Sequence, residues 1–308
     1  MPASAEFRAL AERVCNWGRW GADDEIGTLN LVTDAVRLAA RDCIRSGRAC
    51  SLAMPLSEAS PQTGLMHGRI NPLRTMVAIN APMGPDPSAC RYSDDVVVMG
   101  VQAATHWDAL SHVSFEGRLY NGFPADQIDA SGARRCGIER VATLATRGVL
   151  LDVARALGVE RLAPGTAIGP AELDRAVRLA RLEPRAGDAL LVRTGQAALY
   201  RAGERREYSV GAPGLCMQAA AWFRERDVAA VATDTLAFEL FPSDETAVAL
   251  PVHVLHLVYM GMLQGQNFDL EELSRLCASS GQYAFFLEAS PQPLARAVGT
   301  PVNPVAIF

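Results

Sequence analysis

The chain has 308 residues, of which 49% are hydrophobic and 20% charged, and its net charge is -5. This is the composition of an ordinary globular protein, and it excludes a collagen-like, coiled-coil or disordered chain. A mildly acidic chain has no positive field to hold a polyanion, so nucleic acid is not expected as a partner. Seven widely spaced cysteines without a CxxC pair indicate free thiols in a reducing cytoplasm.

The N-terminal part is predicted to be two helices joined by a loop. Residues 3–15 and 33–46 have apolar side chains at helical spacing. Charged residues interrupt the first of these segments, so it is not a signal peptide. Between the helices, NWGRWGADDEIGTLNLVT carries Trp17 and Trp20. These indoles either pack on the core or wall a ligand pocket, and the sequence leaves both readings open.

Strands and helices are expected to alternate through the rest of the chain. Strand-like, mostly apolar runs, several of them expected to be covered on both faces, occur at 74–80, 95–103, 148–153, 189–194, 228–233 and 283–289. Helices are predicted over 138–146, 169–182, 214–226 and 251–264. The later alternation favours α/β layers, and the strand-rich part before residue 125 favours an additional, partly antiparallel sheet.

The chain is expected to form one domain over residues 1–308, with residues 1–50 as a helical and loop extension, because no linker divides it. The most apolar stretch, 247–263, contains two histidines and falls short of about 20 clean apolar residues, so no membrane partner is expected. A cytoplasmic protein is therefore predicted.

The segment QAATHWDALSHV, residues 102–113, contains the candidate metal-binding and catalytic side chains. If residues 95–108 form a strand, His106 and Asp108 point to the same face. A turn could bring His112 back to that face. Imidazole and carboxylate together suit a divalent metal. The alternative is a polar core cluster satisfied by hydrogen bonds, and the triplet beside Thr105 favours the metal.

The motif THWDALSH resembles the metal-binding motif of the cyclase family of metal-dependent hydrolases, which includes bacterial kynurenine formamidase and isatin hydrolase. Four further segments resemble family blocks in the right order: NWGRWGADDEIGTLNLVT, GDALLVRTG, APGLCMQAAAWFRERDVAAVATDT and PVHVLHLVYMGMLQGQNFDLEEL. The resemblance implies an α/β fold, a swivelling β/β/α domain with layered mixed sheets and flanking helices. It also implies a homodimer or higher homo-oligomer, in which the N-terminal segment can reach the neighbour.

The resemblance also implies roles for individual residues. His106 and Asp108 match metal ligands, and His112 matches the general acid–base of the family. His253 matches a later histidine near the metal. Gln266 stands where the family often has a glutamate ligand; the alternative is a structural amide that never touches the metal.

Two departures from the family pattern change the expected site. Gln102 replaces the first family histidine, so one metal ion is expected in place of two. Gln266 leaves the site more positive by about one charge, which favours substrates or products that carry a carboxylate. The donor types favour manganese, with zinc close behind. Further residues are expected either to contact the substrate or to support the metal ligands by hydrogen bonds and packing. They are His253, Trp107, Trp17, Trp20 and Gln102.

The expected activity is hydrolytic opening of a cyclic amide or lactone, or cleavage of an N-acyl bond, in a small substrate. His112 would move the proton. A dehydratase or cyclase, and a metal-dependent binding protein without turnover, are the alternatives. No serine-hydrolase or nucleotide motif occurs in the sequence. Asp234 either lines the pocket or shapes a turn, and Arg193 is expected to form a structural ion pair.

Overall fold

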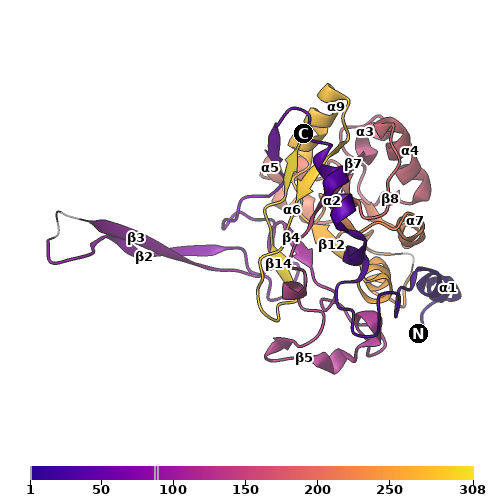
Figure 1. Cartoon of the computed structure of the whole chain (residues 1–308), viewed down its shortest axis with the longest axis horizontal. Coiled ribbons are helices and arrows are strands. Elements are labelled where there is room, and N and C mark those ends of the chain that lie inside the picture. Colours follow the sequence, from indigo (N-terminus) through magenta and orange to yellow (C-terminus); the bar gives the residue numbers. More distant parts are fainter. Residues whose placement is uncertain (1, 87, 89, 244) are drawn as a thin grey trace.

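The computed structural model describes residues 2–86, 88, 90–243 and 245–308. In this part of the chain a mixed nine-stranded sheet forms the centre of the body, and a two-stranded arm projects from it (Figure 1). In spatial order the sheet contains β1 (Ala49–Ser51), β15 (Val305–Ile307), β13 (Ala284–Glu288), β7 (Ala145–Asp152), β9 (Ala189–Arg193), β11 (Ala230–Thr233), β12 (Leu263–Gln266), β4 (His106–Asp108) and β14 (Gly299–Pro301).

The four central strands, β7, β9, β11 and β12, are parallel, and the strands at both ends of the sheet are antiparallel to their neighbours. β9 and β11 are buried at every position, since helices cover both faces of the sheet. This confirms the buried strands predicted around 189–194 and 228–233, and the α/β layering.

Helices cover the sheet on two sides. On one side, the core joins alternate side chains of β7, β9 and β11 to α1 (Ala5–Val14), α4 (Pro170–Ala180), α7 (Ala219–Glu225), α8 (Pro251–His253) and the π-helix η5 (Val254–Met260). On the other side lie Leu150 and Leu191, packed in one cluster with Leu273 and Leu276 of α9 (Glu271–Ser280). α2 (Asp34–Arg41) also packs against β7 and β13.

Short elements connect these layers. They are α3 (Val153–Ala156), α5 (Ala197–Arg201), α6 (Arg205–Ser209), β5 (Ile128–Asp129), β6 (Gly132–Ala133), β8 (Ala167–Ile168), β10 (Gly214–Leu215) and the 3₁₀ turns η1 (Gly27–Leu31), η2 (Tyr120–Gly122), η3 (Ala125–Gln127) and η4 (Ile138–Arg140). Among the described residues no helix combines the length and the apolar character that a membrane crossing needs.

The arm consists of β2 (Leu73–Pro82) and β3 (Arg91–Val98), which pair antiparallel with two register irregularities. The additional antiparallel sheet predicted before residue 125 is therefore present. The expectation that buried strands occur here is wrong, because nearly every position of both strands is exposed. Local apolar character predicts a strand, but only tertiary packing decides whether another layer covers it.

Three predicted boundaries are wrong. The strand expected over 95–103 ends at Val98, and it does not continue to residue 108, because β4 begins only at His106. The helix expected over 138–146 is a single 3₁₀ turn, after which the chain enters β7. The helix expected over 251–264 stops where Gly261 adopts a left-handed conformation, and the apolar residues beyond it form β12. In each case pairing within the sheet overrides the local helical or strand spacing.

The end of the π-helix depends on a close backbone contact. Gly27 has a φ of +56°, and a Cβ there would lie 1.9 Å from the carbonyl oxygen of Gly261. We expect Gly27→Ala to lower the free energy of unfolding by about 3–5 kcal/mol, because no side-chain rotation relieves this overlap. Urea denaturation measures the loss. Gly18→Ala, at a φ of +76° with nothing within 4 Å, is the control and should cost only about 1–2 kcal/mol. Equal losses in the two variants would contradict the prediction.

Candidate metal centre

β4 presents His106 and Asp108 on one face of the sheet, and both side chains are fully buried. They lie two residues apart on a strand, so the predicted common face is confirmed even though the strand is shorter than expected. Trp107 points to the opposite face, where its indole packs edge-on against Phe268 and donates a hydrogen bond to the carbonyl of Ala289. The structure therefore places Trp107 in the core, away from the two polar side chains.

The neighbouring strand adds two amides to this face. In the antiparallel pair of β12 with β4, Gln266 lies opposite His106 and Gln264 lies opposite Asp108. Directly opposite residues share a face, so four polar side chains lie together on the two strands next to the β14 edge of the sheet. Gly265 faces the other way, where a Cβ would lie 2.8 Å from the Trp107 ring.

Four buried atoms of this cluster lack a hydrogen-bond partner in the described structure: Nε2 of His106, Oδ1 of Asp108, and the oxygen and nitrogen of the Gln264 amide. Of these, Nε2 of His106 and Oδ1 of Asp108 face each other at 3.5 Å. Nδ1 of His106 donates to the carbonyl oxygen of Ala104 at 2.7 Å, which leaves the lone pair on Nε2. A buried imidazole nitrogen and a carboxylate oxygen that face each other without a donor match what a divalent cation binds.

The protein does not close this site completely. Within the residues that the structure describes, no group of three or more His, Cys, Asp or Glu side chains is arranged to hold a metal ion. His106 and Asp108 would supply two of the donors that a divalent ion needs.

His112 lies at the edge of the cluster. Its Nε2 is 3.7 Å from Oδ1 of Asp108, and its side chain keeps 17% of its surface exposed. Its Nδ1 lies 3.5 Å from the amide nitrogen of Gln102. The predicted turn thus brings His112 back to the face that carries His106 and Asp108. Of the cluster, His112 is the imidazole that solvent reaches.

Burial and charge act in opposite directions on these groups. Burial opposes ionisation of Asp108, but the imidazoles of His112 and His106 outweigh it and hold the pKa of Asp108 well below its usual range. Burial lowers the pKa of His112, and the Asp108 carboxylate only partly opposes this. Asp108 is therefore an anion and His112 a neutral imidazole near pH 7.

Behind Asp108 runs a chain of hydrogen bonds. The amide nitrogen of Gln266 donates to Oδ2 of Asp108 at 2.7 Å and lies 3.2 Å from Nε2 of His253. His253 bonds Glu239 through Nδ1, and this carboxylate also accepts the backbone N–H groups of Val252 and His253. The chain orients Asp108 from behind. That Gln266 itself ligates a metal stays a prediction, since here it uses its nitrogen toward Asp108.

The remaining sequence candidates lie elsewhere. Trp17 stacks on Tyr259 and donates to the Val258 carbonyl, and Trp20 lies under the Arg19 guanidinium. Trp17 is 37% exposed and Trp20 is half-buried, so neither indole lies in the core, and a pocket role for them stays a prediction. His256 is fully buried between the rings of Phe223 and Phe238, and burial lowers its pKa to about 3. His256 is therefore a core residue.

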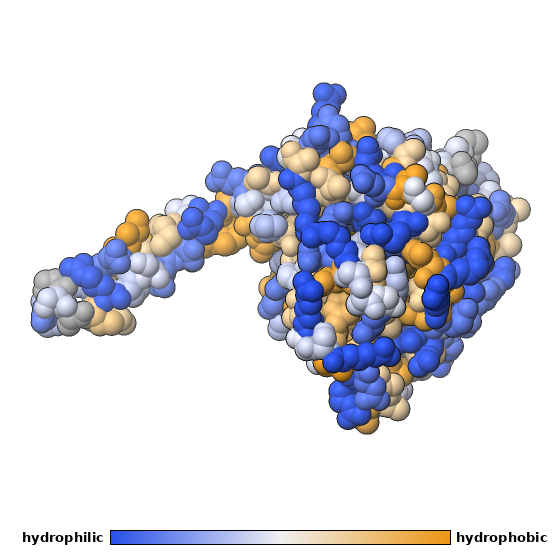
Figure 2. All heavy atoms as spheres, turned by 90° about the horizontal axis from the view of Figure 1, so that it is seen from above, coloured by the Kyte–Doolittle hydropathy of each residue, from blue (hydrophilic) through white to orange (hydrophobic). Residues whose placement is uncertain are grey.

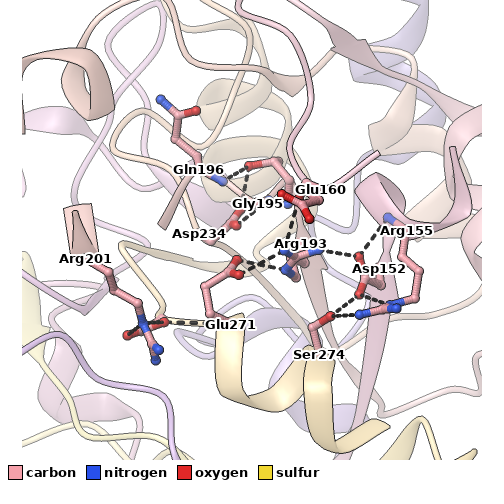
Figure 3. A network of polar contacts seen from close by, with 12 residues as sticks. Asp152, Arg155, Glu160, Arg193, Gly195, Gln196, Arg201, Asp234, Glu271 and Ser274 are labelled. Atoms are coloured by element: carbon pink, nitrogen blue, oxygen red, sulfur yellow. Dashed lines mark hydrogen bonds and ion pairs between the residues drawn. The ribbon is translucent and has the colours of Figure 1, made fainter. Parts of the chain in front are cut away.

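Arg193 and Asp234 belong to a separate polar network (Figure 3). Arg193 pairs with Asp152 and Glu271, as predicted, and forms one wall of a cleft of about 640 Å³. Asp234 accepts hydrogen bonds from Thr194 and from the Gly195 N–H, so it shapes a turn. Burial raises the pKa of Asp234 to about 6, although the bonds from Thr194 oppose this.

Three residues near the cluster were missed by reasoning from the sequence: Arg69, Glu239 and Gln264. Arg69 reaches His112 across 43 residues, and Glu239 reaches His253 across 14. Gln264 lies two residues before Gln266, and only the register with β4 places it opposite Asp108. Arg69 and Glu239 stand in none of the quoted segments, and Gln264 lies in the last of them without a local signal that marks it.

Comparison with known proteins supports the fold. A crystal structure described as a novel cyclase is 35% identical, superposes with a TM-score of 0.88, and is matched over 97% of this chain and 99% of its own. Isatin hydrolase A from Ralstonia solanacearum is 20% identical with a TM-score of 0.62, over 89% and 97% of the two chains. None of the curated proteins matches the chain.

A third structure, described as a potential metal-dependent hydrolase with cyclase activity, is 15% identical with a TM-score of 0.54, over 84% of this chain and 98% of that one. The sequence model of the family described as Cyclase matches residues 50–240. This range includes the arm, β4 with its two polar side chains, His112 and three of the four central strands, β7, β9 and β11. With more than half of its length matched, the chain belongs to the Cyclase family.

Proposed function

We propose that the protein is a metal-dependent hydrolase that opens a cyclic amide or lactone, or cleaves an N-acyl bond, of a small substrate. The observation that carries this proposal is the pair of buried, unpartnered atoms, Nε2 of His106 and Oδ1 of Asp108, beside the partly exposed His112. Structural relatives described as isatin hydrolase and as a metal-dependent hydrolase agree with it.

Each residue of the cluster has a separate task in this proposal. His106 and Asp108 hold one divalent ion, for which manganese is favoured over zinc because water oxygens would join the Asp108 carboxylate as donors. When bound, such an ion polarises a carbonyl and makes water a better nucleophile. His112 accepts the proton of the attacking water and returns it to the leaving nitrogen or oxygen. Gln266 and His253 keep Asp108 in place.

A proton-release screen tests the proposed activity. Opening a lactone, or an anilide whose new amine stays neutral, produces a carboxylic acid that loses its proton near pH 7. Lactones, cyclic imides and N-acyl anilines are offered to the manganese-loaded protein in weak buffer with a pH indicator. Acidification that chelation abolishes supports the hydrolase. Dehydration or binding without turnover releases no proton, so a screen that stays flat would favour those alternatives.

The arm also requires a function. One of its faces carries Asp94 and Thr75 among large apolar side chains that are between 42% and 56% exposed: Leu73, Tyr92, Val96 and Val98. The other face carries the ion pair of Arg74 with Asp95. Figure 2 shows hydrophobic side chains along the arm where it projects from the body. A lone two-stranded ribbon is marginally stable in water, so a partner is needed to cover it.

We propose that this partner is a second copy of the chain. The body near the root of the arm exposes further apolar residues, Leu56, Leu65, Met66 and Ile70. One protomer thus carries both an apolar arm and an apolar surface to receive one, as a two-fold interface requires. An arm face about 30 Å long covers roughly 300 Å². Two arms on two receiving surfaces bury about 1,200 Å², which reaches the size of specific interfaces.

Light scattering of the eluting protein tests this assembly. The molar mass of the wild type is expected to be about twice the 33.0 kDa of one chain. Val96→Asp with Val98→Asp is expected to give monomers, because both carboxylates would enter the apolar contact. Val97→Asp is the matched control, since its side chain lies on the opposite face, and it should remain a dimer. A monomeric wild type, or dissociation by Val97→Asp alone, would contradict the proposal.

A further inference from the structure

A guanidinium lies beside His112, and the proposed mechanism does not use it. Nη2 of Arg69 is 3.5 Å from Nε2 of His112, and the arginine is half-buried. Nε2 is also the nitrogen that lies 3.7 Å from Asp108. Arg69 therefore borders the open side of the cluster, where a bound substrate would lie.

The backbone around Arg69 is held by the loop that leads to β4. The Arg69 N–H donates to the carbonyl of Met66, and the Gly100 N–H donates to the carbonyl of Ile70. Gly100 packs so closely that a Cβ there would lie 3.6 Å from Cα of Arg69. Two residues later, this loop carries Gln102, which contacts His112 from the other side. The same loop thus holds the backbone of Arg69 on one side of the His112 imidazole and carries Gln102 on the other side.

Arg69 has no acidic partner among the residues that the structure describes. It forms no ion pair and no hydrogen bond to a carboxylate, whereas the buried Arg147 and Arg193 each pair with at least one. Burial lowers the pKa of Arg69, and the Asp108 charge only partly compensates. A half-buried guanidinium without a counter-ion is costly, and an anion that binds there removes the cost.

We propose that Arg69 binds a carboxylate of the substrate and so places the scissile bond next to His112. This inference rests on the proposed function and narrows its substrates to small carboxylic acids. The planar fork of a guanidinium donates two parallel hydrogen bonds to the two oxygens of a carboxylate. One arginine balances one negative charge, whereas a phosphate dianion would require more positive groups than this edge of the site offers.

Binding of simple probes, without turnover, tests this inference. Benzoate and its neutral analogue benzamide are titrated into the manganese-loaded protein by calorimetry. The wild type is expected to prefer benzoate. Arg69→Met should weaken benzoate binding roughly 10- to 100-fold and leave benzamide unchanged, because it removes only charged hydrogen bonds. Arg69→Lys should be intermediate, since it keeps the charge without the fork.

The control is Arg45→Met, which removes an equal charge from an exposed position and should bind benzoate like the wild type. Benzoate affinity that is unchanged in Arg69→Met would overturn the inference, since the anion would then bind elsewhere. Equal binding of benzoate and benzamide to the wild type, or inorganic phosphate binding more tightly than benzoate, would overturn it too. If benzoate binding depends on Arg69 but the hydrolysis screen fails, the proposed function is rejected and the inference about carboxylate binding stands.

Discussion

Replacing His106 with alanine is expected to remove the metal ion from the protein while the chain stays folded. In the described cluster, Nε2 of His106 and Oδ1 of Asp108 are the two unpartnered atoms that face each other, and this substitution leaves Asp108 without its imidazole neighbour. In the wild type, Nε2 of His106 makes no hydrogen bond, so the variant loses only the bond from Nδ1 to Ala104. The metal content, measured by elemental analysis after dialysis, should be about one equivalent per chain in the wild type and near zero in the variant.

His256→Asn is the matched control for this prediction. His256 is as buried as His106, but it lies among aromatic rings and not in the cluster. The control should lose stability in thermal unfolding and still retain about one equivalent of metal. Full metal in His106→Ala would show that the ion binds elsewhere. Close to two equivalents in the wild type would contradict the expectation that Gln102 removes a second site.

His112→Ala is expected to lower turnover by about 10²- to 10⁴-fold, the usual contribution of a positioned general acid–base group, while the metal is retained. The partly exposed imidazole touches the cluster only at its edge, so its loss leaves His106 and Asp108 in place. The measurement is kcat on whichever substrate the proton-release screen identifies, together with the metal content of each preparation.

His67→Ala is the control here, because His67 is exposed and makes no contact with the cluster. It should keep wild-type turnover. If His112→Ala were nearly as active as the wild type at full metal content, His112 would not carry the proton, and a water exchanging with solvent would have to do so.

Several features of the site follow from local sequence because the chemistry is local. His106 and Asp108 lie two apart, and any extended backbone places them on one face. His112 follows within one turn, and the structure brings it back as expected. The helix over 169–182 was equally predictable, since Pro170 opens it and Glu172 caps the N–H of Gly169.

Other features depend on partners far away in the sequence. Gln266 reaches Asp108 across 158 residues because the antiparallel pairing of β12 with β4 sets the register. The apolar stretch before it is divided into a π-helix and a strand at Gly261, and helical spacing alone does not reveal this division. Local propensity is weak beside strand pairing in the centre of a sheet.

The sequence by itself determined the α/β layering, the positions of most central strands, and the motif that places an imidazole and a carboxylate on one strand. Only the tertiary structure decided that β2 and β3 leave the body as an arm, that Trp107 faces the core, and that Arg69 borders His112. The reason is physical. Periodicity records which side of an element is apolar, but contacts between residues distant in the chain determine what covers that side and which charges meet.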